Sequence, residues 1–118
     1  MTRLLVASVL AALALGAVPA LGAPKTTLKI TVPPGTAMKY STASLKAKAG
    51  KVTIVMKNLS ILPHDAALKG KGVNAKGKLV AKGGTSTVTA TLKPGKYVFY
   101  CTVPGHAQAG MKGTLTVS

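Results

Sequence analysis

Residues 94–117 read PGKYVFYCTVPGHAQAGMKGTLTV, and this stretch decides most of what the chain is expected to be. A Pro-Gly turn signal opens it, the dense aromatic and β-branched run Tyr97–Cys101 follows, and Thr114–Val117 closes it. Both runs are typical of β-strands, whereas the Pro and Gly residues between them favour turns. The segment between the two expected strands also holds an imidazole and a thioether, just after the only thiol of the chain.

The rest of the chain from about residue 24 has the same character. Apolar residues alternate with polar ones in 28–32, 45–49, 52–56 and 88–92, and Pro, Gly or Lys-Asn ends each run. Residues 69–84 are rich in Gly and Lys, so we expect a loop there with one short strand, Lys78–Ala81. No segment has helical periodicity. The pattern predicts an all-β, Greek-key β-sandwich of about seven or eight strands, formed by residues 24–118.

The composition describes a small basic chain with few reactive groups. It has 118 residues, 16 Lys and Arg against one Asp or Glu, one Cys, and a formal net charge of +15. This length allows one compact domain. A single Cys excludes an intramolecular disulfide framework and a CxxC site. The lone carboxylate, Asp65, excludes hydrolysis by paired acids and metal sites bridged by carboxylates.

Residues 1–23, MTRLLVASVLAALALGAVPALGA, have the pattern of a secretory signal peptide. Arg3 supplies the positive start, an uncharged apolar run follows, and small residues precede the expected cleavage points after Ala20 or Ala23. A retained membrane anchor is the alternative, because the apolar run approaches the length of a spanning helix. The expected location is therefore extracytoplasmic (periplasm, cell-wall space or secreted), with a membrane tether if the signal is retained.

Removal of the signal would leave fifteen Lys against one Asp, a net charge of +14. These lysines are spread from Lys25 to Lys112 rather than gathered in a block. Proteins that bind nucleic acid use Arg and interleaved aromatic residues, so we expect no nucleic-acid partner. Two interpretations stay open: the lysines keep the protein soluble, or they steer it toward an acidic partner or an anionic surface.

Cys101, His106 and Met111 follow one another at five-residue steps, and His64 is the only other histidine. Residues five apart on an unbroken strand face opposite sides, so these groups converge only if the backbone turns, as the Pro-Gly pair before His106 allows. A sandwich can place His64 beside this loop. Two imidazoles, a thiolate and a weak axial thioether are the donor set of a type 1 blue-copper centre, which transfers electrons. We therefore expect one copper ion as cofactor.

The stretch 94–117 resembles the C-terminal copper-binding segment of cupredoxins, the family of plastocyanin and rusticyanin. The upstream stretch KAGKVTIVMKNLSILPHDAAL resembles the strand and loop that deliver the first histidine ligand of that family. The resemblance implies that His64, Cys101 and His106 are equatorial ligands and Met111 the axial one, with Gln108 as a rival. It also implies that His106 reaches the surface within an apolar collar, namely Ile61, Leu62, Pro104, Ala107 and Ala109.

Two further residues stand close to the expected ligands. Many cupredoxins carry Asn after the first histidine, and this chain carries Asp65. We expect Asp65 to accept a hydrogen bond from the backbone N–H or the hydroxyl of Thr102; its negative charge would favour Cu(II) unless it is protonated or firmly hydrogen-bonded. Tyr100 lies beside Cys101 and, by the resemblance, marks a second exit for the electron.

The function expected is a secreted type 1 copper protein that carries single electrons by Cu(II)/Cu(I) cycling and is not an enzyme. Its expected partners are acidic redox proteins or a membrane electron-transport complex, docking transiently to a monomer. A copper-binding or copper-delivery module outside the cytoplasm is the alternative. Other interpretations of the same residues are a buried structural Cys101, a Cys-His nucleophile pair and a zinc site, for which Met is a poor fourth ligand.

Overall fold

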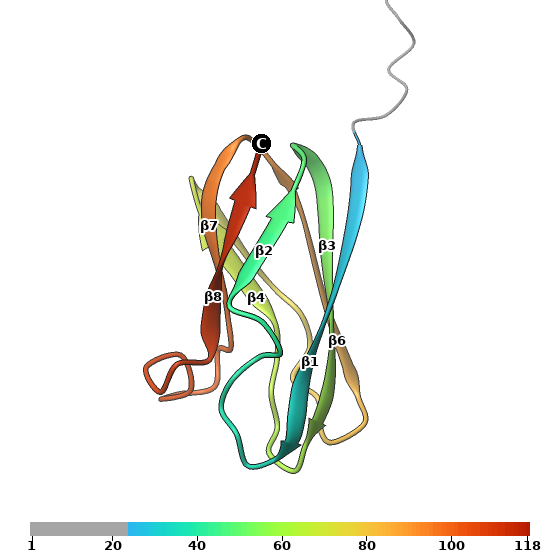
Figure 1. Cartoon of the computed structure of the whole chain (residues 1–118), viewed down its shortest axis with the longest axis vertical. Coiled ribbons are helices and arrows are strands. Elements are labelled where there is room, and N and C mark those ends of the chain that lie inside the picture. Colours follow the sequence, from blue (N-terminus) through green and yellow to red (C-terminus); the bar gives the residue numbers. More distant parts are fainter. Residues whose placement is uncertain (1–23) are drawn as a thin grey trace, which may run out of the picture.

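The structure is a computed structural model that describes residues 24–118; the expected signal segment, residues 1–23, and its cleavage points lie outside the described residues. The described part forms eight strands and no helix, so it holds no helix able to cross a membrane (Figure 1). The strands are β1 (Lys25–Gly35), β2 (Ser44–Ala47), β3 (Gly50–Ser60), β4 (Ala67–Gly70), β5 (Val73–Lys76), β6 (Thr85–Leu92), β7 (Gly95–Tyr100) and β8 (Lys112–Val117).

The strands form two sheets that pack as a sandwich (Figure 1). One sheet has the order β1-β3-β6, and the other has the order β2-β8-β7-β4-β5. The pairs β1–β3 and β2–β8 are parallel, and the remaining pairs are antiparallel. Neighbours in each sheet are mostly not consecutive in sequence, as a Greek-key arrangement requires. The predicted all-β sandwich is thereby confirmed.

The core follows from the period-2 pattern of the strands. Val52, Ile54 and Met56 of β3 are fully buried, whereas the residues between them are partly exposed. Successive side chains of a strand point to opposite faces, so one face of β3 packs inward. On the opposite sheet the fully buried Phe99 packs its ring 5.6 Å from that of Tyr40. Each large side chain buried in this way contributes about 1.5–3 kcal/mol, which makes the sandwich a rigid frame for its loops.

The structure corrects the expected loop 69–84. Residues on either side of Lys71 and Gly72 form the antiparallel hairpin β4–β5, and both turn residues have positive φ, 47° and 79°. Lys is rarely left-handed, so the turn had no clear sequence signal. The short strand expected at 78–81 is absent from the described fold; only Val80 makes an isolated bridge, to His64.

The end of β1 also differs from expectation, because the strand continues through its two prolines to Gly35. Its pairing with β3 shifts between Val32 and Gly35, where Gly35 has φ 95° and lies opposite Ser60. Proline is tolerated here because β1 is an edge strand. The loops after β1, β3 and β7 then meet at the end of the sandwich away from the C-terminus (Figure 1).

Candidate metal centre

His64 lies between β3 and β4 and is fully buried. Its backbone pairs with Val80, with N–O distances of 3.1 Å and 2.9 Å in the two directions. Asn58, also fully buried, donates from Nδ2 to the carbonyl of Leu62 at 2.8 Å and to that of Val80 at 3.0 Å. These bonds hold the segment before His64 in one conformation, although it is not part of a strand.

The loop from Cys101 to Met111 folds back on itself. The backbone N–H of Cys101 donates to the carbonyl of Met111 at 3.1 Å, and the N–H of Met111 donates to that of His106 at 3.0 Å. Gly105 and Gly110 have φ of 82° and 110°, values at which glycine has no steric cost. The expected turn therefore forms. It brings Cys101, His106 and Met111, which are five residues apart in sequence, next to one another in space.

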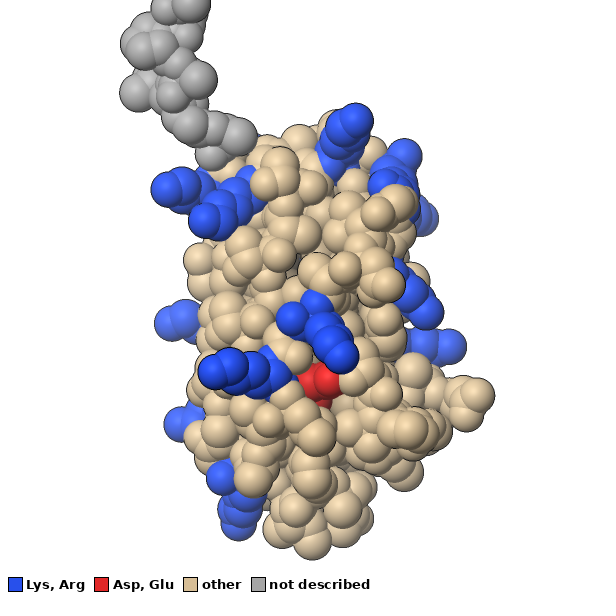
Figure 2. All heavy atoms as spheres, turned by 180° about the vertical axis from the view of Figure 1, so that it is seen from behind, with Lys and Arg blue, Asp and Glu red and all other residues tan. Residues whose placement is uncertain are grey.

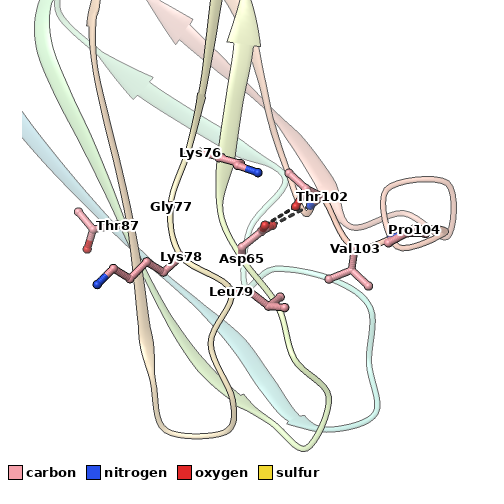
Figure 3. A pocket seen from close by; sticks show the side chains of 9 residues that line it. All are labelled: Asp65, Lys76, Gly77, Lys78, Leu79, Thr87, Thr102, Val103 and Pro104. Carbon is pink, nitrogen blue, oxygen red and sulfur yellow. Dashed lines mark hydrogen bonds between the residues drawn. The ribbon is translucent and has the colours of Figure 1, made fainter.

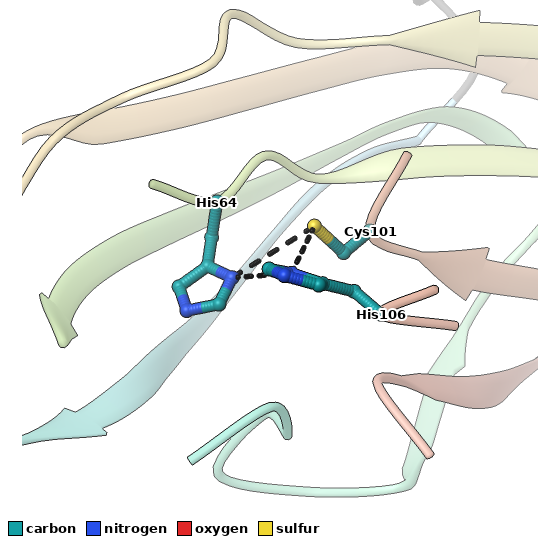
Figure 4. A group of neighbouring side chains, drawn as sticks. All are labelled: His64, Cys101 and His106. Carbon is teal, nitrogen blue, oxygen red and sulfur yellow. Dashed lines mark hydrogen bonds between the residues drawn. The ribbon is translucent and has the colours of Figure 1, made fainter. Parts of the chain in front are cut away.

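Three donor atoms from these two segments face one another (Figure 4). The Nδ1 atoms of His64 and His106 are 3.1 Å apart, and the Sγ atom of Cys101 lies 3.9 Å and 3.7 Å from them, respectively. Metal–nitrogen and metal–sulfur bonds of about 2.0–2.3 Å place the donors of one ion roughly 3–4 Å apart. The three residues, which span 42 positions from His64 to His106, thus fit a single first-row metal ion.

Met111 is fully buried, and its backbone joins both Cys101 and His106. Gln108, the rival axial donor, is exposed. The thioether of a buried side chain is the weak, soft ligand that type 1 copper takes at its axial position. The burial of the two side chains therefore favours Met111 over Gln108.

Burial shifts the pKa values of two of the donors, His64 and Cys101. It lowers the pKa of His64, an effect to which the neighbouring His106 adds and which Asp65 opposes. It raises the pKa of the Cys101 thiol, although backbone hydrogen bonds from Asp65 and Val103 act the other way. A metal binds a neutral imidazole and a thiolate. His64 is already neutral at neutral pH, whereas the Cys101 thiol must lose its proton when the metal binds.

The expected contact between Asp65 and Thr102 is confirmed, and both of its forms are present (Figure 3). The backbone N–H of Thr102 donates to Oδ1 of Asp65 at 2.7 Å, and its hydroxyl donates to Oδ2. The hydroxyl of Tyr40, which sequence reasoning missed, donates to the carbonyl of Asp65 at 2.7 Å. The two bonds from Thr102 join the segment that carries His64 to the segment that carries Cys101, and the bond from Tyr40 joins the loop between β1 and β2 to the former. Asp65 and Thr102 also lie in the wall of an open groove beside Lys76 and Lys78 (Figure 3).

The surface near the site combines apolar side chains with a lysine that lies over an aromatic ring. All five residues of the expected collar are at least partly exposed, and Ile61 is 61% exposed. The ring of His106 is half-buried. Tyr100 is also half-buried, and the Nζ atom of Lys69 lies 4.4 Å above the centre of its ring. The side of the site at Tyr100 is therefore positively charged.

Known proteins share both the sequence pattern and the fold. The family model described as "Copper binding proteins, plastocyanin/azurin family" matches residues 26–118. Auracyanin-B of Chloroflexus aurantiacus is 58% identical over 33 residues, which are 28% of this chain and 14% of that protein. The chain thus spans only a small part of this curated relative.

Solved structures match over most of the chain. The reduced auracyanin of Roseiflexus castenholzii has a TM-score of 0.70 and 28% identity, covering 82% of this chain and 99% of that one. Auracyanin A of Chloroflexus aurantiacus, a "blue" copper protein, has a TM-score of 0.69 and 26% identity, covering 80% of this chain and 100% of that one. With the sandwich and the His-Cys-His cluster already described, the family match leads to one conclusion: the chain belongs to the plastocyanin/azurin family of copper-binding proteins, the cupredoxins.

Proposed function

We propose that this chain is a type 1 copper protein that carries single electrons between redox partners outside the cytoplasm. The observation that carries the proposal is the convergence of two Nδ1 atoms and one thiol sulfur, all within 4.8 Å of one another, from segments far apart in the sequence. Copper, when bound, supplies a one-electron couple between Cu(II) and Cu(I). The residues that would hold it are His64, Cys101 and His106, with Met111 as the axial donor.

The chain's own contribution is a donor set that stays in place when the charge at its centre changes. The bridge between His64 and Val80 and the bonds between Asp65 and Thr102 fix both ligand segments to the sandwich. Donors held in this way need little rearrangement on electron transfer, and little rearrangement makes the transfer fast.

Burial also favours a carrier over an enzyme. Cys101 is 1% exposed and His64 is fully buried, whereas a catalytic metal needs a position open to substrate. The half-buried ring of His106 then offers the shortest route between the site and a partner. Burial likewise favours retention of the metal, so electron transfer is preferred to copper delivery.

The proposed partners are acidic redox proteins, or a membrane complex with an acidic docking face, that bind a monomer briefly. Figure 2 shows lysines scattered over one face of the molecule with a single acidic residue among them. A surface with one sign of charge attracts the opposite sign and gives fast, weak and salt-sensitive association. The signal-like segment 1–23 supports an extracytoplasmic location, where such partners would be met.

The test is a visible and EPR spectrum of the copper-loaded protein, followed by voltammetry. We expect intense absorption near about 600 nm, which is typical of copper–thiolate bonding in this class of site, and a reversible one-electron wave. Cys101→Ser is the matched control and should lose the band. A colourless loaded protein that yields its copper to a mild chelator would instead support copper delivery.

A further inference from the structure

The nitrogen of His64 that faces away from the donor cluster has its own partner. Nε2 of His64 lies 3.3 Å from the hydroxyl oxygen of Ser60, and both residues are fully buried. Nδ1 of the same ring lies on the side of Cys101 and His106. Neutral imidazole carries one proton, on either nitrogen, and only the bare nitrogen can bind a metal. The side of the ring that holds the proton therefore decides whether His64 is a ligand.

The contacts of the Ser60 hydroxyl settle that choice by a count of donors. A hydroxyl has one proton to donate and two lone pairs to accept with. The backbone N–H of Leu62 donates to Oγ of Ser60 at 3.0 Å, and Oγ donates to the carbonyl of Gly35 at 2.9 Å. The carbonyl can only accept, so the proton of the hydroxyl belongs there. The contact with His64 then needs a proton from Nε2, because otherwise two acceptors would face each other.

The fold holds this hydroxyl in position from two sides. Gly35 ends β1 with φ 95° opposite Ser60, and its carbonyl also accepts from the N–H of Ile61 at 3.0 Å. The N–H of Ser60 donates to Oδ1 of Asn58 at 2.9 Å. A rotation of the hydroxyl toward Nε2 would leave the carbonyl of Gly35 facing an oxygen with no proton between them. Two acceptor oxygens 2.9 Å apart repel each other, so the hydroxyl keeps its proton on the side of Gly35.

The choice matters because the neighbouring ring offers a competing arrangement. The Nδ1 atoms of His64 and His106 are 3.1 Å apart, a distance at which one proton between them can belong to either ring. A proton on Nδ1 of His64 would block its metal-binding nitrogen. Ser60 removes this possibility by requiring the proton on the far side of the ring.

We propose that Ser60 is a positioning residue that fixes His64 in the Nε2–H form and so keeps its Nδ1 lone pair free for the metal. Ser60 does not touch the donor atoms of Cys101 or His106; it acts through His64. This inference rests on the proposed function, since it assigns His64 as a ligand. The inference adds Ser60 to the residues that support the site. Its role follows from two hydrogen bonds in series, from the Ser60 hydroxyl to the Gly35 carbonyl and from Nε2 of His64 to that hydroxyl.

The experiment compares Ser60→Ala with Ser86→Ala in the full chain. Ser86 is the matched control because it is also fully buried, and its hydroxyl accepts from the backbone N–H of Ala66 at 3.1 Å without contacting His64. Nitrogen-15 NMR of the imidazole rings in the metal-free protein reports the position of each proton. Competition with a copper(I) chelator reports the affinity.

In the unsubstituted chain we expect Nε2–H at His64, and in Ser60→Ala a mixture with Nδ1–H. We expect copper affinity to fall by about 10–100-fold in Ser60→Ala, the usual effect of removing a partner of a ligating histidine, and to change far less in Ser86→Ala. A wild-type His64 with its proton on Nδ1 would overturn the proposal, as would unchanged tautomer and affinity in Ser60→Ala. The wild-type spectrum decides the matter even if Ser60→Ala does not fold.

The two proposals fail in different ways. The proton position is read without copper, so a missing blue band would overturn the electron-carrier function and leave the NMR result standing. Conversely, a blue protein with Nδ1–H at His64 before loading would overturn the role of Ser60 alone.

Discussion

Asp65 accepts two hydrogen bonds from Thr102, one from its backbone N–H at 2.7 Å and one from its hydroxyl. Each partner is next in sequence to a proposed ligand, since Asp65 follows His64 and Thr102 follows Cys101. The pair therefore connects the two halves of the site through side-chain atoms. Asp65 is also the only carboxylate side chain of the whole sequence and is 3% exposed, so its charge acts where little water screens it.

Asp65→Asn should raise the reduction potential. The substitution keeps the shape and one oxygen acceptor but removes a negative charge; the hydrogen bonds from Thr102 weaken the preference of this charge for Cu(II) over Cu(I) but do not cancel it. We expect a rise on the order of 60 mV, which corresponds to about a tenfold change in the preference between the two oxidation states. Cyclic voltammetry of the copper-loaded protein measures it. The blue band should persist in the variant, and an unchanged or lower potential would contradict the prediction.

Copper binding should release a proton from Cys101. Burial raises the pKa of this thiol above its usual value near 8.5, so the metal-free protein carries it protonated at neutral pH. Burial lowers the pKa of His64, so this ring is neutral there and has no extra proton to lose. Cys101 should thus release about one proton per copper at pH 7, falling toward zero above the raised pKa. A weakly buffered indicator titration measures the difference from Cys101→Ser, and equal release by the two proteins would refute this origin.

His106→Gly should slow electron transfer and preserve the fold. Its ring is half-buried, while the His64 ring and the Cys101 sulfur are fully enclosed, so His106 offers the route to the surface. We expect the rate with a small redox reagent, measured by stopped flow, to fall by more than about tenfold. Gln108→Gly, an exposed change in the same loop, is the control and should keep its rate. Equal rates in the two variants would exclude His106 as the exit.

Salt should slow the reaction with anionic reagents. The described residues include fifteen lysines, and the screening length falls from about 10 Å at 0.1 M to about 3 Å at 1 M ionic strength. The rate with hexacyanoferrate should therefore drop over this range, while a neutral reagent should react at a nearly constant rate. Comparable behaviour of both reagents would mean that the lysines only keep the protein soluble.

Gly113→Ala should destabilise the fold. Gly113 of β8 lies opposite Phe99 of β7, and an added Cβ would meet the Phe99 ring and approach the carbonyl oxygen of Ala43 to 2.7 Å. Overpacking of this kind costs about 1–3 kcal/mol. Urea unfolding measures it, with the exposed neighbour Thr114→Ala expected to change stability by about 0.5 kcal/mol or less. Equal midpoints for the two variants would show that the ring moves away without cost.

The long strands could be predicted because their pattern is local. In β3 and β6 the alternation of apolar and polar residues identifies strand and inward face together, and in β7 the dense aromatic and β-branched run identifies the strand. The hairpin β4–β5 could not be predicted, because its turn uses a left-handed lysine, Lys71, and its strands have only four residues each. Tyr40 and Ser60 were missed for another reason: their partners Asp65 and Gly35 are 25 positions away, and neither side chain carries a local signal.

The sequence by itself determined the class of fold and the four side chains most suited to copper, since strand periodicity and donor chemistry are properties of a few neighbouring residues. The tertiary structure alone decided which atoms face one another. Parallel pairing of β1 with β3 brings Gly35 to Ser60, and the pairing of β4 with β7 brings the His64 segment beside Cys101. Such pairings depend on the register of distant strands, which the packing of the whole core selects and no short stretch of sequence encodes.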